Sequence, residues 1–181
     1  QYSKYVECKI EQTKKNFRLF SPARLDVIPK FDLDELDLGR VLERGAAGGG
    51  VVREIRAIDC KRSSSGNELD DSQSDADKEF LSSHCIRDGG DARYVIKTLA
   101  PDTATDPESY ARTVVDLAVE TIFLSVLSHP HLITMRAVGA GGMLSNYYFI
   151  VVDRLCDTLD ARIRKWGRGR SKKAGGMVGK L

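Results

Sequence analysis

Short runs of apolar residues, separated by polar or glycine-containing turns, divide much of the chain into predicted strands and one long helix. Runs with the composition typical of strands cover 36–45, 51–59, 94–99, 132–138 and 147–153. Between the third and fourth runs, apolar residues recur every three or four positions on two stripes, which predicts a helix buried on more than one side. Asp106, Pro107 and Glu108 favour its start, and we expect it to end near Leu127.

The order of these elements predicts the fold class. Hairpin-type connections favour antiparallel pairing, so we expect an α+β fold with a five-stranded, mostly antiparallel sheet and one main helix packed on it. We place this domain at residues 37–153. Residues 154–181 follow it, with a short helix expected from Leu159 to Trp166 and then a basic, glycine-rich tail.

Two segments do not fit this pattern. Residues 1–36 mix charges with scattered apolar side chains and include Pro22 and Pro29, so we expect an extended or loosely structured leader of unclear function. Residues 61–92 are rich in serine, glycine and acidic residues and predict a disordered insertion between two strands. Ser72 and Ser74 precede acidic residues and could be phosphorylated, but such serines are frequent by chance and a solvated loop is the favoured interpretation.

Composition excludes some classes of function. The chain has 181 residues, 41% hydrophobic, 30% charged and with a net charge of +2, which is ordinary for one globular domain and indicates no particular partner. No apolar run approaches the roughly 20 residues that a membrane span needs. His84, Cys60 and Cys85 fit no zinc-site spacing, so we expect no metal site in this chain and free thiols in an intracellular protein, cytoplasmic or nuclear.

The strongest candidate chemistry is a lysine, a glutamate and a His-Pro pair at a particular spacing. Lys97 ends a predicted strand, Glu120 lies among apolar residues of the predicted helix, and His129 and Pro130 follow that helix. A cation on a rigid strand is suited to binding phosphates, and a flexible lysine needs a fixed anion to hold it in place. The simpler alternative is an exposed edge lysine and a solvated glutamate.

This set of residues resembles the small, nucleotide-binding lobe of eukaryotic-type protein kinases, over roughly 38–166. The resemblance implies that Lys97 pairs with Glu120 and holds the α- and β-phosphates of ATP, which is bound together with Mg²⁺. It also implies that His129 belongs to a structural turn and is not catalytic. The chain starts at Gln1 and contains no His-Arg-Asp or Asp-Phe-Gly, so we expect a fragment that ends before the catalytic loop, with the metal ligands outside it.

The resemblance implies further ATP-binding residues. A glycine-rich segment between the first two predicted strands matches the family's phosphate loop in two incomplete registers, through Gly45, Gly48, Gly50 and Val52. An anion-binding loop and a merely flexible hairpin both remain open there. Val95 stands where the family normally has alanine. By position, Val152 is the gatekeeper beside the adenine, while Asp153 offers a backbone carbonyl and Leu155 a backbone amide.

Three functions are compatible with these residues. The resemblance implies a protein kinase, with Ser/Thr specificity favoured only by the family's base rate and the protein substrate unknown. We predict that this chain alone does not transfer phosphate, because the required aspartates are missing. The alternatives are a pseudokinase-like interaction module and a binder of anionic surfaces through the basic run that starts at Arg162. Nucleic-acid binding is disfavoured, since Trp166 is the only aromatic residue in that run.

Overall fold

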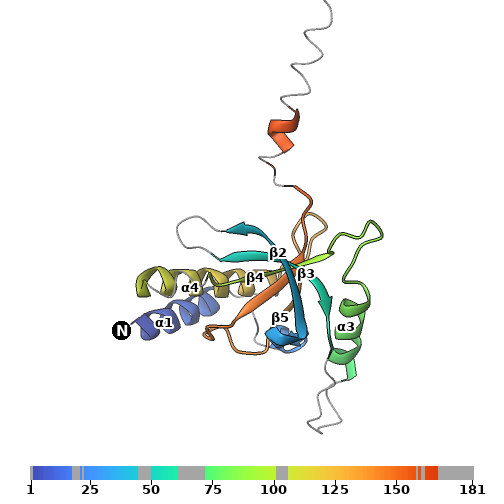
Figure 1. Ribbon diagram of the computed structural model, residues 1–181. Coiled ribbons are helices and arrows are strands. Elements are labelled where there is room, and N and C mark those ends of the chain that lie inside the picture. The colour runs from blue at the N-terminus through green and yellow to red at the C-terminus, as the bar shows by residue number, and fades with distance from the viewer. Residues whose placement is uncertain are drawn as a thin grey trace, which may run out of the picture.

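The computed structural model describes residues 2–17, 21, 23–44, 50–60, 72–100, 106–157, 159 and 162–166. These residues form an α+β fold around a six-stranded open sheet with strand order β1-β5-β6-β4-β3-β2 (Figure 1). The strands are β1 (Lys30–Phe31), β2 (Leu36–Arg44), β3 (Val51–Ile58), β4 (Tyr94–Thr98), β5 (Met135–Gly139) and β6 (Phe149–Asp153). The antiparallel pairing of β2 to β6 confirms the predicted strands, with ends shifted by up to three residues.

The main helix, α4 (Pro107–Leu124), was predicted correctly at its start and ends three residues earlier than expected. The Asp106 carboxylate accepts the backbone N–H groups of Glu108 and Ser109, each at 3.2 Å, and so caps the helix. One face of α4 is buried against one face of the sheet, in a cluster that includes Val114, Leu117, Ala118, Ile122, Val95, Ile150 and Val152. This packing fixes α4 next to β4 and β6.

The expectation of a loose leader is wrong for its described part. Residues Tyr2–Asn16 form a helix, α1, that packs alongside α4 (Figure 1). Val6 and Ile10 are buried in the core shared with α4, and the Phe17 ring lies 4.5 Å from the Phe123 ring between centroids. These apolar residues are four and seven positions apart, which is one stripe of a helix. Part of the segment before residue 37 therefore contributes to the same core as α4.

The remainder of that segment also joins the fold. The short helices α2 (Ala23–Asp26) and η1 (Leu33–Glu35) flank β1, which pairs in parallel with β5. This sixth strand makes the sheet mixed, whereas the sequence predicted five strands. The buried Glu35 carboxylate accepts the backbone N–H of Asp32 at 2.6 Å, so a charged side chain inside the fold has a partner.

The prediction of a disordered insertion is also wrong for the residues of that segment that the structure describes. Residues 61–71 lie outside the described part, but Ser72–Ser83 form helix α3. Leu81 and Cys85 are buried against the face of the sheet opposite α4, and the Ser82 hydroxyl donates to the Ile58 carbonyl at 2.6 Å. Leu81 of α3 and Cys85 just after it thus dock a segment that is mostly polar. The possible phosphorylation sites Ser72 and Ser74 lie in the first turn of α3.

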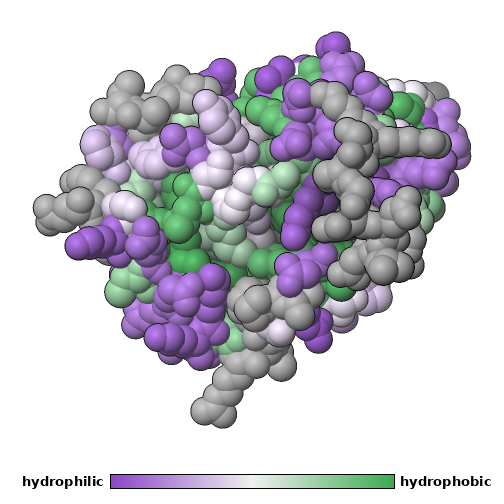
Figure 2. Space-filling model, turned by 90° about the horizontal axis from the view of Figure 1, so that it is seen from below, coloured by the Kyte–Doolittle hydropathy of each residue, from purple (hydrophilic) through white to green (hydrophobic). Residues whose placement is uncertain are grey.

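The surface carries both apolar and polar side chains. Seen from below, apolar side chains form separate patches divided by polar ones (Figure 2). In the part of the chain that the structure describes, no helix is both long and apolar enough to cross a membrane.

Candidate functional site

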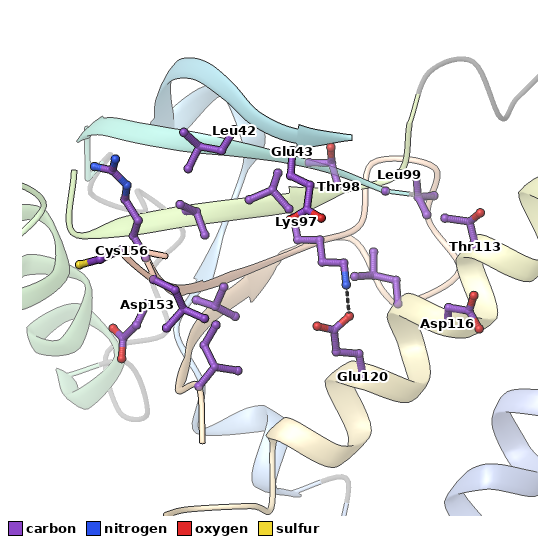
Figure 3. A pocket seen from close by; sticks show the side chains of 18 of the residues that line it. Leu42, Glu43, Lys97, Thr98, Leu99, Thr113, Asp116, Glu120, Asp153 and Cys156 are labelled. Atoms are coloured by element: carbon purple, nitrogen blue, oxygen red, sulfur yellow. Dashed lines mark hydrogen bonds and ion pairs between the residues drawn. The ribbon is translucent and has the colours of Figure 1, made fainter. Parts of the chain in front are cut away.

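A cavity of about 640 Å³ opens between α4, the strands β2, β3 and β4, and the segment that follows β6 (Figure 3). Most of the residues predicted from the sequence line it: Gly50, Val52, Val95, Lys97, Glu120, Val152, Asp153 and Leu155. The other two, Gly45 and Gly48, lie outside the described residues. The structure therefore brings residues from four separate elements to one cavity.

Lys97 and Glu120 form the predicted ion pair across this cavity (Figure 3). Side chains alternate along a strand, so Val95 and Lys97 of β4 both face α4 while Ile96 enters the core on the opposite face. Glu120 reaches Lys97 from α4. Each charged side chain remains about one-third exposed, at 35% for Lys97 and 34% for Glu120. The ammonium group is thus positioned by a fixed anion and remains open to a ligand in the cavity.

Apolar side chains make the inner part of the cavity. Val95 of β4 is paired with Val152 of β6, and Val52 of β3 is paired with Lys97. Val95 and Val152 are both buried, and Leu42 and Ile133 add to the same lining. A flat apolar ring could lie against this surface while a charged group of the same ligand reaches Lys97.

Gly50 lies where β3 leaves the glycine-rich segment, beside β4. A Cβ atom on this residue would come within 2.5 Å of the Thr98 carbonyl oxygen, a backbone atom that cannot turn aside. Glycine at this position therefore permits a close approach of two strands at the edge of the cavity.

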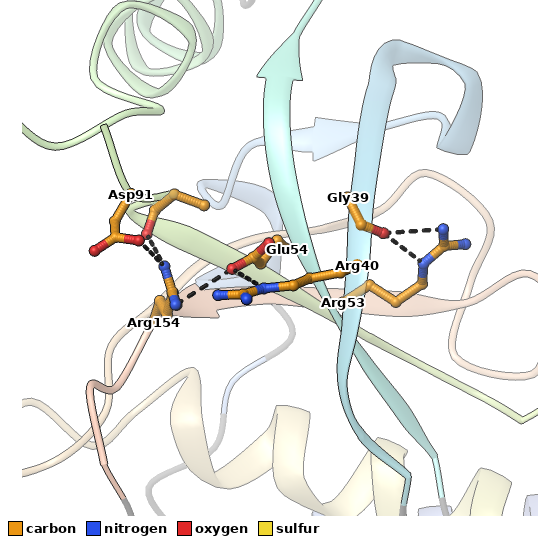
Figure 4. A network of polar contacts seen from close by, with 7 residues as sticks. Gly39, Arg40, Arg53, Glu54, Asp91 and Arg154 are labelled. Atoms are coloured by element: carbon orange, nitrogen blue, oxygen red, sulfur yellow. Dashed lines mark hydrogen bonds and ion pairs between the residues drawn. The ribbon is translucent and has the colours of Figure 1, made fainter. Parts of the chain in front are cut away.

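The end of β6 and the segment after it form the far wall, and the charged side chains of Asp153 and Arg154 there are already paired. The Asp153 carboxylate accepts two hydrogen bonds from the Arg136 guanidinium, at 2.9 and 3.0 Å, which raise the pKa of Arg136. The Arg154 guanidinium forms ion pairs with Glu54 and Asp91, each at 3.2 Å (Figure 4). The Asp153 and Arg154 side chains are therefore held in these pairs, and both residues line the cavity.

Sequence reasoning missed several lining residues. Asp116 and Thr113 precede Glu120 by one and two turns of α4, so helical spacing alone could have placed them on the same face. Glu43 lies across the cavity on β2. Because Lys97 and Arg154 are the cationic lining residues and both are in ion pairs, an anionic ligand would be favoured by an accompanying cation.

The histidines and cysteines make no site in the described residues. His129 accepts the backbone N–H of His131 at 3.1 Å, the arrangement of a structural turn, and His84 stacks on Phe80. Burial raises the pKa of the Cys85 thiol to about 11, so this group is neutral and unreactive at ordinary pH. No cluster of three or more histidine, cysteine or acidic side chains that could hold a metal ion is found in the described ranges.

Comparison of the sequence with protein-family models and with curated proteins found no match. The resemblance to protein kinases is therefore an inference from the residues and their arrangement.

Proposed function

We propose that this chain binds ATP with Mg²⁺ in the cavity between the sheet and α4, as the nucleotide-binding lobe of a protein kinase. The observation that supports this most is the Lys97–Glu120 ion pair at one end of a cavity whose apolar part is lined by Val95 and Val152. An apolar slot for a base and a fixed ammonium for phosphates are the two features that a nucleotide requires.

The proposal assigns a role to each part of the cavity. The adenine ring lies against Val52, Val95 and Val152, and its polar edge meets the Asp153 carbonyl and the Leu155 amide. The phosphates extend towards Lys97, which Glu120 keeps in position. Mg²⁺ offsets the repulsion between the phosphates and the acidic lining residues, and ligands for it belong to a part of a kinase that these 181 residues do not include.

One observation favours a second candidate, a pseudokinase-like interaction module. Glu43 and Asp116 place carboxylates in the cavity, and these oppose a polyphosphate. In that case the lobe keeps its fold and the Lys97–Glu120 pair has only a structural role.

Direct binding measurements separate the two candidates. Titration calorimetry of the 181-residue chain with ATP and Mg²⁺ should show binding that Lys97→Met weakens at least about tenfold, since a charge-assisted contact to phosphate is lost. Lys4→Met is the matched control, because it removes the same charge from an exposed residue of α1 that does not line the cavity. A folded wild-type chain that binds no nucleotide, or equal effects of both substitutions, would favour the interaction module.

A second measurement concerns catalysis. With radiolabelled ATP, Mg²⁺ and generic protein substrates, the chain alone should transfer no phosphate, because it lacks the aspartates that orient the hydroxyl and bind the metal. Turnover that Lys97→Met abolishes would contradict this expectation.

A further inference from the structure

The hairpin after α3 touches the wall of the cavity. Ile86 bridges to Ala92, and the Arg93 amide donates to the Cys85 carbonyl at 2.7 Å. Its tight turn is closed by the Gly90 amide, which donates to the Arg87 carbonyl at 2.8 Å, with Gly90 at φ 81°. We call residues 85–93 the hinge hairpin. These bonds hold it in a defined shape although much of its surface is exposed.

Arg87 connects the hinge hairpin to the segment after β6. Its guanidinium Nη2 donates to the Arg154 carbonyl at 2.6 Å, and Nη1 lies 3.5 Å from the Cys156 sulfur. On the same side, the Arg154 amide donates to the Arg93 carbonyl at 2.8 Å. The backbone N–H and C=O of Arg154 are therefore both engaged towards the hinge hairpin.

The Arg154 side chain strengthens this attachment. It is only 15% exposed and pairs with Glu54 of β3 and with Asp91 of the hinge hairpin (Figure 4). Three elements thus meet at one residue in the cavity wall.

Peptide geometry transmits this attachment to the cavity. Across a trans peptide bond, the C=O of one residue and the N–H of the next point in opposite directions. The Asp153 carbonyl must therefore point away from the Arg154 amide, and the Leu155 amide away from the Arg154 carbonyl. Both groups are directed to the side opposite the hinge hairpin, and both residues line the cavity.

We propose that Arg87 is a positioning residue that fixes the backbone of Asp153 to Leu155 so that one carbonyl and one amide face the cavity as a pair. Such a pair recognises a ring with a donor and an acceptor on the same edge, as a purine base has. The identity of this ligand rests on the proposed function, whereas the backbone arrangement does not.

The test compares Arg87→Ala and Arg87→Lys with Asp88→Ala in the full chain. Asp88 is exposed at the turn of the same hairpin, and the described residues give its side chain no hydrogen bond or ion pair. In the absence of ligand, Arg87→Ala should speed hydrogen exchange of the Asp153 and Arg154 amides, which donate to the Thr134 and Arg93 carbonyls, about tenfold or more. Arg87→Lys keeps one donor and should restore much of the protection, while Asp88→Ala should change nothing.

Ligand binding gives the second readout. Arg87→Ala should weaken the binding of adenosine and of ATP by the same factor, about tenfold, because it disturbs only the groups that meet the base. Lys97→Met should weaken the binding of ATP and leave the affinity for adenosine unchanged. Unchanged exchange of the Asp153 and Arg154 amides, or a loss of affinity confined to ATP, would overturn the proposed role of Arg87. If the wild-type chain binds neither ligand, the proposed function fails while the exchange comparison still decides whether Arg87 positions this backbone.

Discussion

Replacing Glu120 with glutamine tests whether the Lys97–Glu120 ion pair serves mainly the stability of the fold or the binding of a ligand. Glu120→Gln keeps the shape of the side chain and removes its charge. Because both partners are about one-third exposed, the pair contributes at most about 1 kcal/mol to the free energy of unfolding. For a chain of this size that corresponds to a fall in melting temperature of about 2–4 °C. Stability should therefore change little.

The effect on nucleotide affinity should be much larger. Without the Glu120 carboxylate, the flexible Lys97 side chain loses its fixed partner and is no longer held in the orientation proposed for binding the phosphates. We expect the dissociation constant for ATP to rise about tenfold or more, although the cavity has lost a negative charge. General electrostatics predicts the opposite sign, since fewer carboxylates should favour an anion.

Asp116→Asn is the control that decides between these two explanations. Asp116 lies one turn before Glu120 on α4 and lines the same cavity, but no hydrogen bond or ion pair joins it to Lys97 in the described structure. Removing its charge should leave ATP affinity unchanged or increase it. Calorimetric titration and thermal melting of both variants provide the measurements. If the two variants shift ATP affinity in the same direction and by the same factor, the Glu120 carboxylate does not act by holding Lys97 in place.

Three further changes test the supports of the cavity. Gly50→Ala should lower the free energy of unfolding by about 1–3 kcal/mol in denaturant titrations and loosen the end of β3, because the new Cβ meets the Thr98 carbonyl oxygen. Asp106→Ala should cost about 1 kcal/mol by loss of the helix cap, and Asp106→Asn much less. The buried Cys85 thiol has its pKa raised from 9.0 to about 11, so its contribution to stability is complete below pH 9 and is lost as pH rises towards 11. This loss in the free energy of unfolding amounts to about 1.4 kcal/mol at pH 10. Cys85→Ala should abolish it, which thermal melts recorded at a series of pH values would measure.

Much of the fold was predictable because its signal is local. Alternation along the strands and the cap of α4 both lie within short stretches of sequence, and they gave the β2 to β6 order correctly. The two-residue β1 is too short to show alternation. In α1 the informative residues were Val6, Ile10 and Phe17, whose helical spacing was obscured by the prolines that follow in the same segment. The apolar residues that dock α3 are Leu81 and, just after the helix, Cys85, which are too few for composition to reveal.

The residues of the candidate site were likewise predictable only in part. The Lys97–Glu120 ion pair was predictable because these two residues and the His-Pro pair stand at the spacing found in the kinase small lobe that the sequence resembles. Arg87 was not, because its contact with the Arg154 carbonyl joins residues 67 positions apart and uses a backbone acceptor that every residue possesses. No pattern in the sequence distinguishes such an arginine from a solvated one.

The two segments that the sequence pattern left unassigned prove to support opposite walls of the cavity. α1 packs its buried Val6 and Ile10 against α4, the helix that carries Glu120. The hinge hairpin holds the wall after β6 through Arg87 and Arg154. A site that depends on a fixed ion pair and on two directed backbone groups needs both walls to be rigid. Under the proposed function, changes in α1 should therefore affect the binding of the phosphates, through Glu120 and Lys97, whereas changes in the hinge hairpin should affect the binding of the base.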